Sequence, residues 1–387
     1  MNKINFFFLF LLLATLPIFS QDDIQITHAP YLQNLGENEV TIIWTVNKPS
    51  VGWVELAPDD GTHFYQTERP KFFNAKNGIK QTSTVHAVHL KGLKAGTRYR
   101  YRVYSQEVLS HVGWRVIYGN VAATSVYGKQ PLEFQTSDHS RQAVNFAMVN
   151  DIHGKSDLLE KLVSHCDLKT TDMFLFNGDM VSIFNSEKEI FEGFMDKATE
   201  LFASEIPMYY TRGNHETRGS FATAFQDYFS PKQEHIYYMF RQGPVCFVIL
   251  DSGEDKPDSD LEYAGITVYD QYRTEQAEWL KGVLESKEYK EAPFKVVVCH
   301  IPPFGGWHGN EEVAEKFMPL LNNAGVDIML CAHLHRYIRN DAKEDVRFPI
   351  IVNSNNTVLK AEADSRALNI KILDTEGKEI DKLTIAK

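Results

Sequence analysis

The distribution of hydrophobic and polar residues divides the chain into two regions. In residues 24–137, short runs rich in β-branched and aromatic residues are separated by turn signals, as in Val40–Val46, Val51–Leu56 and Thr84–Leu90. Arg98–Val103 alternates charged and apolar residues, which is the pattern of a half-buried strand. This region is therefore predicted to be all-β.

One segment of this region adds detail to the prediction. Leu93–Tyr99 resembles the tyrosine corner of fibronectin type III sandwiches, with Trp44 as the core tryptophan of an early strand. His86 and His89 are also present, but no nearby residue completes a metal site, so we interpret them as ordinary strand residues. We expect a fibronectin type III-like sandwich over residues 24–137.

Beyond a polar linker at Ser137–Gln142, strand-like and helix-like patterns alternate over residues 138–387. The strand-like runs are Ala143–Val149, Met173–Phe176, Pro207–Tyr210, Val245–Leu250, Phe294–Cys299, Asp327–Cys331 and Phe348–Val352. Apolar stripes with helical spacing occur over 158–163, 190–202, 275–284 and 313–321. The acidic segment Ser252–Asp270 is expected to be a surface loop. Such alternation predicts a layered α/β domain.

The charge of the chain restricts the classes of partner. With 387 residues the chain can form two domains, and its formal net charge is −11. Binding to the backbone of nucleic acids or to anionic membranes depends on clustered Lys and Arg, so neither is expected. A small phosphorylated substrate remains compatible with this charge if metal ions supply positive charge locally.

The N-terminus has the pattern of a signal peptide. Lys3 precedes an apolar run at Ile4–Leu13, and Pro17 and Ser20 come before a polar segment. The run is too short to span a bilayer, and no later stretch reaches transmembrane length. We predict a signal peptide over residues 1–20 and an exported mature protein, periplasmic or secreted.

The four cysteines are predicted to be buried small hydrophobic residues. Cys246, Cys299 and Cys331 each lie in an apolar strand-like run, and Cys166 is the fourth. The chain contains no Cys-x-x-Cys pair, so we do not expect these cysteines to bind a metal. Export would permit disulfides, so their redox state is left open.

Polar groups that can bind metals follow several of the predicted strands. These groups are Asp151 and His153, Asp179, Asn214 with His215 and Glu216, His300, and finally His333 and His335. Because parallel strands place their carboxyl ends on one edge of a sheet, these side chains are expected to converge. Oxygen and nitrogen donors of this kind suit Zn, Mn or Fe.

The order of these motifs resembles the calcineurin-like metallophosphoesterase superfamily, with its pattern D-x-H, G-D, G-N-H-D/E, H and G-H-x-H. Together with the sandwich, the chain looks like a relative of purple acid phosphatases, which implies a layered α/β/β/α sandwich. The resemblance also implies two metal ions, one held by Asp151, His153, Asp179 and His335. The second would be held by Asp179, Asn214, His300 and His333, with Asp179 bridging the two. It further implies that His215 faces the phosphate, and Glu216 could orient that ring.

The chain departs from the purple acid phosphatase pattern at three positions. His153 stands where that branch has Gly, and Ser182 stands where it has a tyrosine ligand. Ala332 replaces the usual Gly before His-x-His, which Ala can accommodate unless the backbone there is left-handed. We therefore expect two divalent or mixed-valence ions from Zn, Mn and Fe rather than the purple ferric centre.

Two adjacent cations would bind phosphoryl oxygens and lower the pKa of a bound water, which predicts a phosphohydrolase acting on a small phosphorylated substrate, most simply a phosphomonoester. His308 and Arg212 are further candidates for contacting the substrate, although Arg212 also suits a structural ion pair. A phosphodiesterase with the same metal core and a non-catalytic cell-surface binding protein are the alternatives. The pattern leaves the oligomeric state open.

Overall fold

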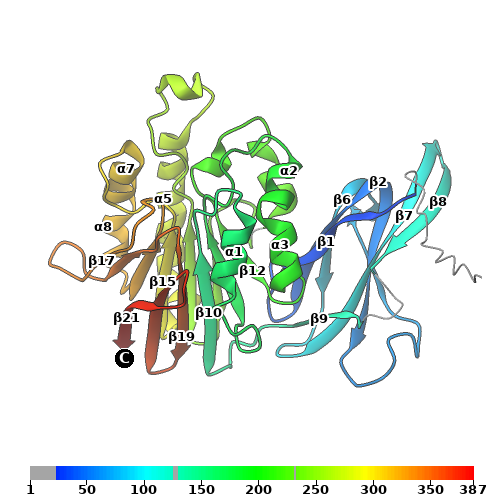
Figure 1. Ribbon diagram of the computed structural model, residues 1–387, viewed down its shortest axis with the longest axis horizontal. Coiled ribbons are helices and arrows are strands. Elements are labelled where there is room, and N and C mark those ends of the chain that lie inside the picture. Colours follow the sequence, from blue (N-terminus) through cyan, green and yellow to red (C-terminus); the bar gives the residue numbers. More distant parts are fainter. Residues whose placement is uncertain (1–22, 125–129, 231) are drawn as a thin grey trace, which may run out of the picture.

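The computed structural model describes residues 23–124, 130–230 and 232–387. An all-β region and a larger α/β region lie side by side, with the all-β region against helices α2 (Glu187–Ile190) and α3 (Asp196–Ala198) (Figure 1). The predicted signal peptide at residues 1–20 lies outside the described residues. None of the described helices is long and apolar enough to cross a membrane.

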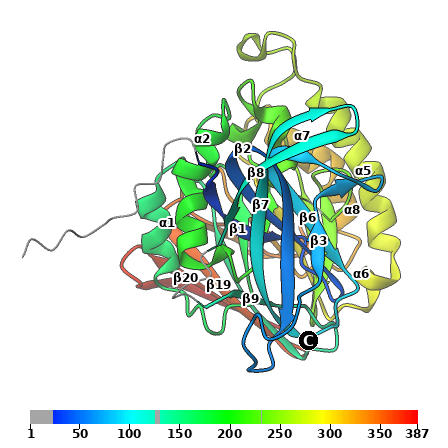
Figure 2. The same cartoon turned by 90° about the vertical axis from the view of Figure 1, so that its right-hand side faces the viewer.

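The all-β region is organised around one long strand, β2 (Glu39–Pro58). Its first half pairs with β1 (Ile26–Gln33) and β6 (Thr82–Lys91), and its second half pairs with β7 (Arg98–Val112) and β3 (Lys71–Phe73). Figure 2 shows these strands face on. The remaining strands are β4 (Ala75–Lys76), β5 (Ile79–Lys80), β8 (Arg115–Ala123) and β9 (Leu132–Gln135).

The interior of this region contains the two residues expected from the sequence. Trp44 is fully buried, and its indole N–H donates to Ser105 Oγ at 2.8 Å. The hydroxyl of Tyr99 accepts a hydrogen bond from the backbone N–H of Lys94 at 3.0 Å, as in a tyrosine corner. His86 is a buried strand residue, in agreement with its interpretation from the sequence.

The α/β region contains two six-stranded sheets. The first has the order β12-β11-β10-β19-β20-β21 and the second the order β13-β14-β15-β16-β18-β17. The strands of the first sheet are β10 (Ala143–Val149), β11 (Met173–Asn177), β12 (Met208–Thr211), β19 (Thr357–Asp364), β20 (Ala367–Asp374) and β21 (Glu379–Ala386). Those of the second are β13 (Tyr238–Gln242), β14 (Val245–Leu250), β15 (Phe294–Cys299), β16 (Ile328–Cys331), β17 (Ile338–Asn340) and β18 (Ile350–Val352).

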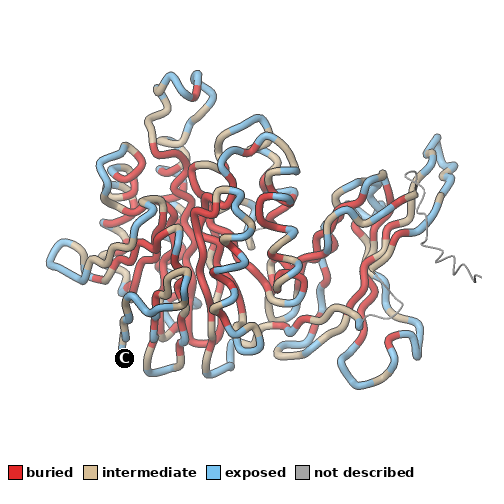
Figure 3. The backbone as a smooth tube through the Cα atoms, in the orientation of Figure 1, coloured by how far each residue is buried: buried red, intermediate tan, exposed pale blue. Residues whose placement is uncertain are grey.

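These sheets form the two inner layers of a four-layer α/β/β/α sandwich, which confirms the predicted fold class. Apolar side chains such as Phe146 and Phe247 fill the space between the sheets and are buried along with most of the strand residues (Figure 3). Helices cover the outer faces. They are α1 (Ser156–Val163), the α2–α3 segment, α4 (Phe225–Tyr228), α5 (Tyr269–Glu285), α6 (Lys287–Glu291), α7 (His308–Lys316) and α8 (Met318–Leu321).

One of these helical segments, residues 187–203, contains two π-helical turns. It consists of α2 (Glu187–Ile190), a π turn at Phe191–Met195, α3 (Asp196–Ala198) and a second π turn at Thr199–Ala203. Short 3₁₀ turns occur at His215–Thr217, Ala222–Ala224 and Leu261–Tyr263. The apolar stripe over 190–202 predicted this segment but not its wide turns.

The two regions share an apolar and hydrogen-bonded junction. Tyr31 of β1 is fully buried within the core that lies beneath the helices of the first sheet, and its hydroxyl donates to the carbonyl oxygen of Tyr228 at 2.7 Å. The ring of His28 stacks on Phe191, with centroids 3.7 Å apart. The sandwich is therefore packed into the α/β region rather than tethered to it.

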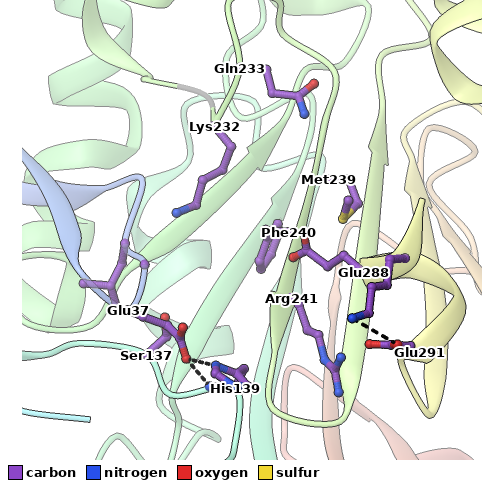
Figure 4. A pocket seen from close by; sticks show the side chains of 13 residues that line it. Glu37, Ser137, His139, Lys232, Gln233, Met239, Phe240, Arg241, Glu288 and Glu291 are labelled. Carbon is purple, nitrogen blue, oxygen red and sulfur yellow. Dashed lines mark hydrogen bonds and ion pairs between the residues drawn. The ribbon is translucent and has the colours of Figure 1, made fainter. Parts of the chain in front are cut away.

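A pocket of about 630 Å³ lies at this junction beside the edge strand β13 (Figure 4). Its walls carry both signs of charge, including Glu37 and Glu288 as well as Lys232 and Arg241. None of the seven expected metal ligands lines it. The concavity seen in Figure 4 is therefore distinct from the candidate site described below.

All four cysteines are buried and free, which confirms their interpretation as small hydrophobic residues. Burial raises the pKa of the Cys166 thiol to about 11 and that of Cys246 to about 12. Thiols in such surroundings remain protonated near neutral pH and are poor nucleophiles.

Candidate metal centre

The expected ligands follow the carboxyl ends of five parallel strands. Asp151 follows β10, Asp179 follows β11, Asn214 follows β12, His300 follows β15 and His333 follows β16. The two sheets thus contribute to one edge of the sandwich, where loops can carry chemistry. The structure brings together all seven side chains that the sequence predicted.

Tight turns of left-handed backbone hold most of these residues. Five of the seven have positive φ angles, namely Asp151, His153, Asp179, His333 and His335, with values from 51° to 72°. This conformation is unfavourable for residues with a Cβ and is concentrated at functional sites in proteins. The φ angle of Ala332 is not positive, so Ala is compatible with the position that usually holds Gly.

The first group of ligand atoms comes from Asp151, His153, Asp179 and His335. His335 Nε2 lies 3.2 Å from Asp151 Oδ1 and 3.1 Å from His153 Nε2. His153 Nε2 lies 4.0 Å from both Asp151 Oδ1 and Asp179 Oδ2. Two carboxylates and two imidazoles therefore point at a common centre.

The second group comes from Asp179, His300 and His333, with Asn214 beside them. His300 Nε2 lies 3.2 Å from Asp179 Oδ2, and His333 Nδ1 lies 3.0 Å from Asn214 Oδ1. Asp179 belongs to both groups, which is the position of a bridging ligand. Its other oxygen, Oδ1, accepts a hydrogen bond from the backbone N–H of His215 at 2.9 Å.

Two buried atoms in this cluster make no hydrogen bond within the described part of the chain, and this supports cation binding. Asp151 Oδ1 and His300 Nε2 belong to almost completely buried residues and form no hydrogen bond. Each faces an ion-pair partner at 3.2 Å without hydrogen-bond geometry. His300 Nδ1 is engaged by the carbonyl oxygen of Asn177 at 2.7 Å, which leaves Nε2 as the ligand atom. Buried polar atoms are normally satisfied, so these two fit metal ligands.

The electrostatics of the cluster differ from one group to another. Burial lowers the pKa of His300, but the adjacent carboxylates of Asp179 and Asp151 outweigh it and raise that pKa to about 10. For Asp179, burial raises the pKa, and the neighbouring imidazole of His300 reverses the effect so that the pKa falls well below its usual range. Burial and the nearby His300 lower the pKa of His333 to about 4.

His215 lies at the edge of the cluster with one ring nitrogen already engaged. Its Nδ1 is 2.6 Å from the carbonyl oxygen of Ser182, to which it donates, and its Nε2 is 3.9 Å from Asp179 Oδ2. The ring also meets His153 edge-on, with centroids 4.7 Å apart. His215 therefore presents Nε2 toward the predicted metal ligands.

Glu216 takes a different position from the one expected. The sequence suggested that it orients His215, but the Ser182 carbonyl contacts that ring instead. The Glu216 carboxylate is buried and accepts hydrogen bonds from the backbone N–H groups of Asp179, Met180, Val181 and Gly213. Glu216 thus binds the turn that carries Asp179 rather than the ring of its own neighbour.

Arg212 forms the structural ion pair that was the alternative to a substrate contact. Its guanidinium lies 2.7 Å from Asp251 Oδ2 and over the rings of Tyr269 and Tyr272. The residue is buried, with 7% of its surface exposed. These contacts occupy the group that would otherwise meet a phosphate.

His308 lies at the first position of α7, where its Nε2 is 2.7 Å from Asp270 Oδ1. Arg273 also contacts Asp270, at 3.0 Å. His308 therefore belongs to a second charged cluster, and its contact with a substrate remains a prediction.

Three asparagines support the cluster but were not identified as functional from the sequence. Asn150 Nδ2 donates to Asp151 Oδ2 at 2.7 Å, and Asn353 Nδ2 donates to Asn150 Oδ1 at 2.7 Å. Asn177 supplies the carbonyl oxygen that engages His300. Asn150 and Asn177 could have been identified because each is a polar residue at the end of an apolar strand. Asn353 could not, because its partner Asn150 is 203 residues away.

Comparison with known proteins gives matches over both regions. The family model for calcineurin-like phosphoesterases matches residues 144–337, a range that includes all seven predicted ligands. The model for the N-terminal domain of purple acid phosphatases matches residues 28–118.

Individual relatives are distant. Purple acid phosphatase 18 from Arabidopsis thaliana is 24% identical over 340 residues, covering 81% of this chain and 67% of that protein. Purple acid phosphatase 22 from the same plant is 27% identical, covering 63% of this chain and 56% of that protein. This chain thus spans between half and about two thirds of the length of these relatives. The solved structure of purple acid phosphatase PPD1 from yellow lupin (Lupinus luteus) superimposes with a TM-score of 0.67 at 16% identity, covering 92% of this chain and 74% of that chain.

Proposed function

Because this chain belongs to the calcineurin-like phosphoesterase family, we propose that it is an exported, metal-dependent phosphatase that hydrolyses phosphomonoesters. The observation that carries the proposal is the pair of ligand groups that share Asp179. The buried atoms Asp151 Oδ1 and His300 Nε2, which form no hydrogen bond, support the same conclusion. The names of the relatives, purple acid phosphatases, support a monoester substrate.

We assign the ligands as the two groups suggest. Asp151, His153, Asp179 and His335 would hold one ion, and Asp179, Asn214, His300 and His333 would hold the other. When bound, two such ions supply Lewis acidity, which offsets the charge of the phosphoryl group and makes water more acidic. The donor set of oxygen and nitrogen suits Zn, Mn or Fe.

The protein's own contribution centres on His215. Because Nδ1 is bound to the Ser182 carbonyl, any proton for a leaving alkoxide would be held on Nε2. The backbone N–H of His215 donates to Asp179 Oδ1, which couples the position of this ring to the bridging carboxylate. His215 is thus placed to act as a general acid beside the predicted metal ligands.

The remaining assignments concern processing and domain limits. We propose that residues 1–20 are a signal peptide and that the mature protein is periplasmic or secreted. The limits 24–137 for the sandwich and 138–387 for the catalytic domain agree with the end of β9 at Gln135 and the start of β10 at Ala143.

The test is a hydrolysis screen with metal analysis on the same sample. The full chain should contain two metal ions and hydrolyse an aryl phosphate faster than a bis-aryl phosphate. Asp179→Asn keeps the shape of the side chain but removes the charge between the two ions, so both ions and turnover should be lost. Preferential cleavage of the diester would instead identify a phosphodiesterase, and two ions with a near-normal rate in Asp179→Asn would refute the ligand assignment.

A further inference from the structure

We propose that Glu216 is a positioning residue that holds the turn of the bridging ligand Asp179 in its metal-binding conformation. The proposal rests on the proposed metal-dependent function and assigns to Glu216 a role separate from that of His215. It is carried by the hydrogen bonds that converge on one buried carboxylate.

Both oxygens of Glu216 accept hydrogen bonds, and four of the five donors are backbone N–H groups, which can only donate. Oε2 accepts from the N–H of Asp179 at 2.9 Å and from that of Gly213 at 2.8 Å. Oε1 accepts from the N–H of Met180 at 2.7 Å and of Val181 at 3.3 Å, and from the hydroxyl of Tyr210 at 2.9 Å. Only 1% of the surface of Glu216 is exposed, so its carboxylate is bound by protein groups and not by solvent.

These bonds act on a turn whose backbone conformation is unfavourable. Asp179 has a φ angle of 54°, which is an unfavourable backbone conformation for this residue. Consecutive N–H groups that point into one concave turn form an anion-binding nest, and the Glu216 carboxylate occupies it. The hydrogen bonds to the Glu216 carboxylate therefore stabilise the turn and offset the cost of the left-handed backbone at Asp179.

The same carboxylate fixes the distance between two ligand loops. Gly213 approaches Asp179 so closely that a Cβ there would lie 2.3 Å from Asp179 Oδ1. Glu216 binds the N–H of both residues, and Asn214 follows Gly213 directly. Displacement of this turn would move Asp179, which belongs to both ligand groups, so both ions should be affected together.

The experiment compares how firmly the loaded full-length variants retain metal. Glu216→Gln removes the charge and places an NH₂ group against backbone donors whichever way the amide is turned. Tyr210→Phe removes one of the hydrogen bonds and leaves the carboxylate. Glu254→Gln is the matched control, because Glu254 is also 1% exposed but binds Arg218 and Thr217 instead of the Asp179 turn.

Each zinc-loaded protein would be dialysed against a series of zinc–chelator buffers, and the zinc remaining per chain would be measured. Changes in ligand-supporting residues commonly weaken metal binding 10–100-fold, so Glu216→Gln should lose both ions at about 10–100-fold higher free zinc than the unmodified chain. Tyr210→Phe should show a smaller shift in the same direction. Glu254→Gln should lower the unfolding midpoint but keep the zinc profile.

A folded Glu216→Gln protein with an unchanged zinc profile would overturn the proposal. If that variant does not fold, Tyr210→Phe decides, since a profile equal to that of the control would also overturn it. Equal zinc loss in Glu254→Gln would show a general effect of buried charge and would count against positioning. An unmodified chain that binds no divalent ion would refute the proposed function itself, which is a different result.

Discussion

The Nδ1 atom of His215 lies 2.6 Å from the carbonyl oxygen of Ser182 and donates a hydrogen bond to it. A carbonyl oxygen can only accept, so this contact fixes the proton of the neutral ring on Nδ1 and leaves Nε2 facing Asp179. Ser182 therefore acts on the site through its backbone, at a position where the purple enzymes have a tyrosine ligand.

We expect His215→Ala to slow hydrolysis of an alkyl phosphate about 10²–10⁴-fold, because an alkoxide leaving group needs a proton. The loss with a nitrophenyl phosphate should be much smaller, because nitrophenolate leaves without protonation. Steady-state kinetics on both substrates measure the difference. Equal losses would indicate that His215 binds the phosphate or that another group is the acid.

The metal-loaded protein should be colourless or nearly so. Charge transfer from tyrosinate to ferric iron gives the purple colour in the relatives that the motif resembles, and Ser182 supplies no phenolate. The nearby Tyr209 and Tyr210 donate their hydroxyls to the Leu35 carbonyl and to Glu216. An intense visible band in a preparation with stoichiometric iron would show that a tyrosine nevertheless reaches the metal.

The sandwich should lose stability in acid because of His86. This ring is fully buried between Trp44 and Gly52, and burial lowers its pKa from 6.5 to about 4. Between these two values the unfolded chain binds a proton that the folded chain does not, so stability falls as the pH falls from 6.5 to 4. The loss from this group should reach about 3 kcal/mol, at 1.36 kcal/mol per pKa unit.

Denaturant unfolding at several pH values measures this effect. His86→Gln cannot be protonated, so its unfolding free energy should depend less on pH over this range than that of the unmodified chain. The difference between the two curves isolates His86 from the carboxylates that also titrate. Parallel curves would mean that the ring is not kept neutral by burial.

The junction between the regions should contribute stability without contributing to metal binding. Tyr31 fills the core under the helices and donates to the Tyr228 carbonyl. Truncation of a buried aromatic residue typically costs about 3–5 kcal/mol, so Tyr31→Ala should reduce the free energy of unfolding by that amount. The folded variant should still contain two metal ions per chain, and loss of metal from folded protein would contradict this.

The convergence of the metal-binding side chains could be predicted because each motif follows a strongly apolar strand. His300 after Phe294–Cys299 and His333 after the strand ending at Cys331 are examples. The position of each motif directly after a strand was enough to predict the convergence, since parallel strands bring their carboxyl ends to a common edge. The predicted layers were correct for the same reason.

Other features depend on partners that are distant in sequence. The carboxylate of Glu216 binds backbone N–H groups up to 37 residues away. Because nearly every residue type has a backbone N–H group, the sequence does not indicate which ones Glu216 binds. Strand β21 was not predicted because it is mostly polar and exposed, and its pairing with β20 defines it. Strand β20 was also not predicted, although it alternates the buried residues Leu368, Ile370 and Ile372 with polar ones, which is the pattern of a half-buried strand. The sequence around Arg212 was compatible with a phosphate contact or an ion pair, and only the fold brings Asp251 beside it.

The two π turns in residues 187–203 set the rotational phase of that segment. A single-residue deletion within either turn could restore α-helical spacing with little change in rotational phase, because a π turn uses about one residue more than an α turn for nearly the same rotation. Phe191 is the first residue of the first π turn and stacks on His28 of the sandwich. Phe202 lies in the second π turn and stacks on Phe174 of the first sheet. A chain shortened by one residue between Phe191 and Phe202 could therefore keep both of these stacks, with one π turn converted into an α turn.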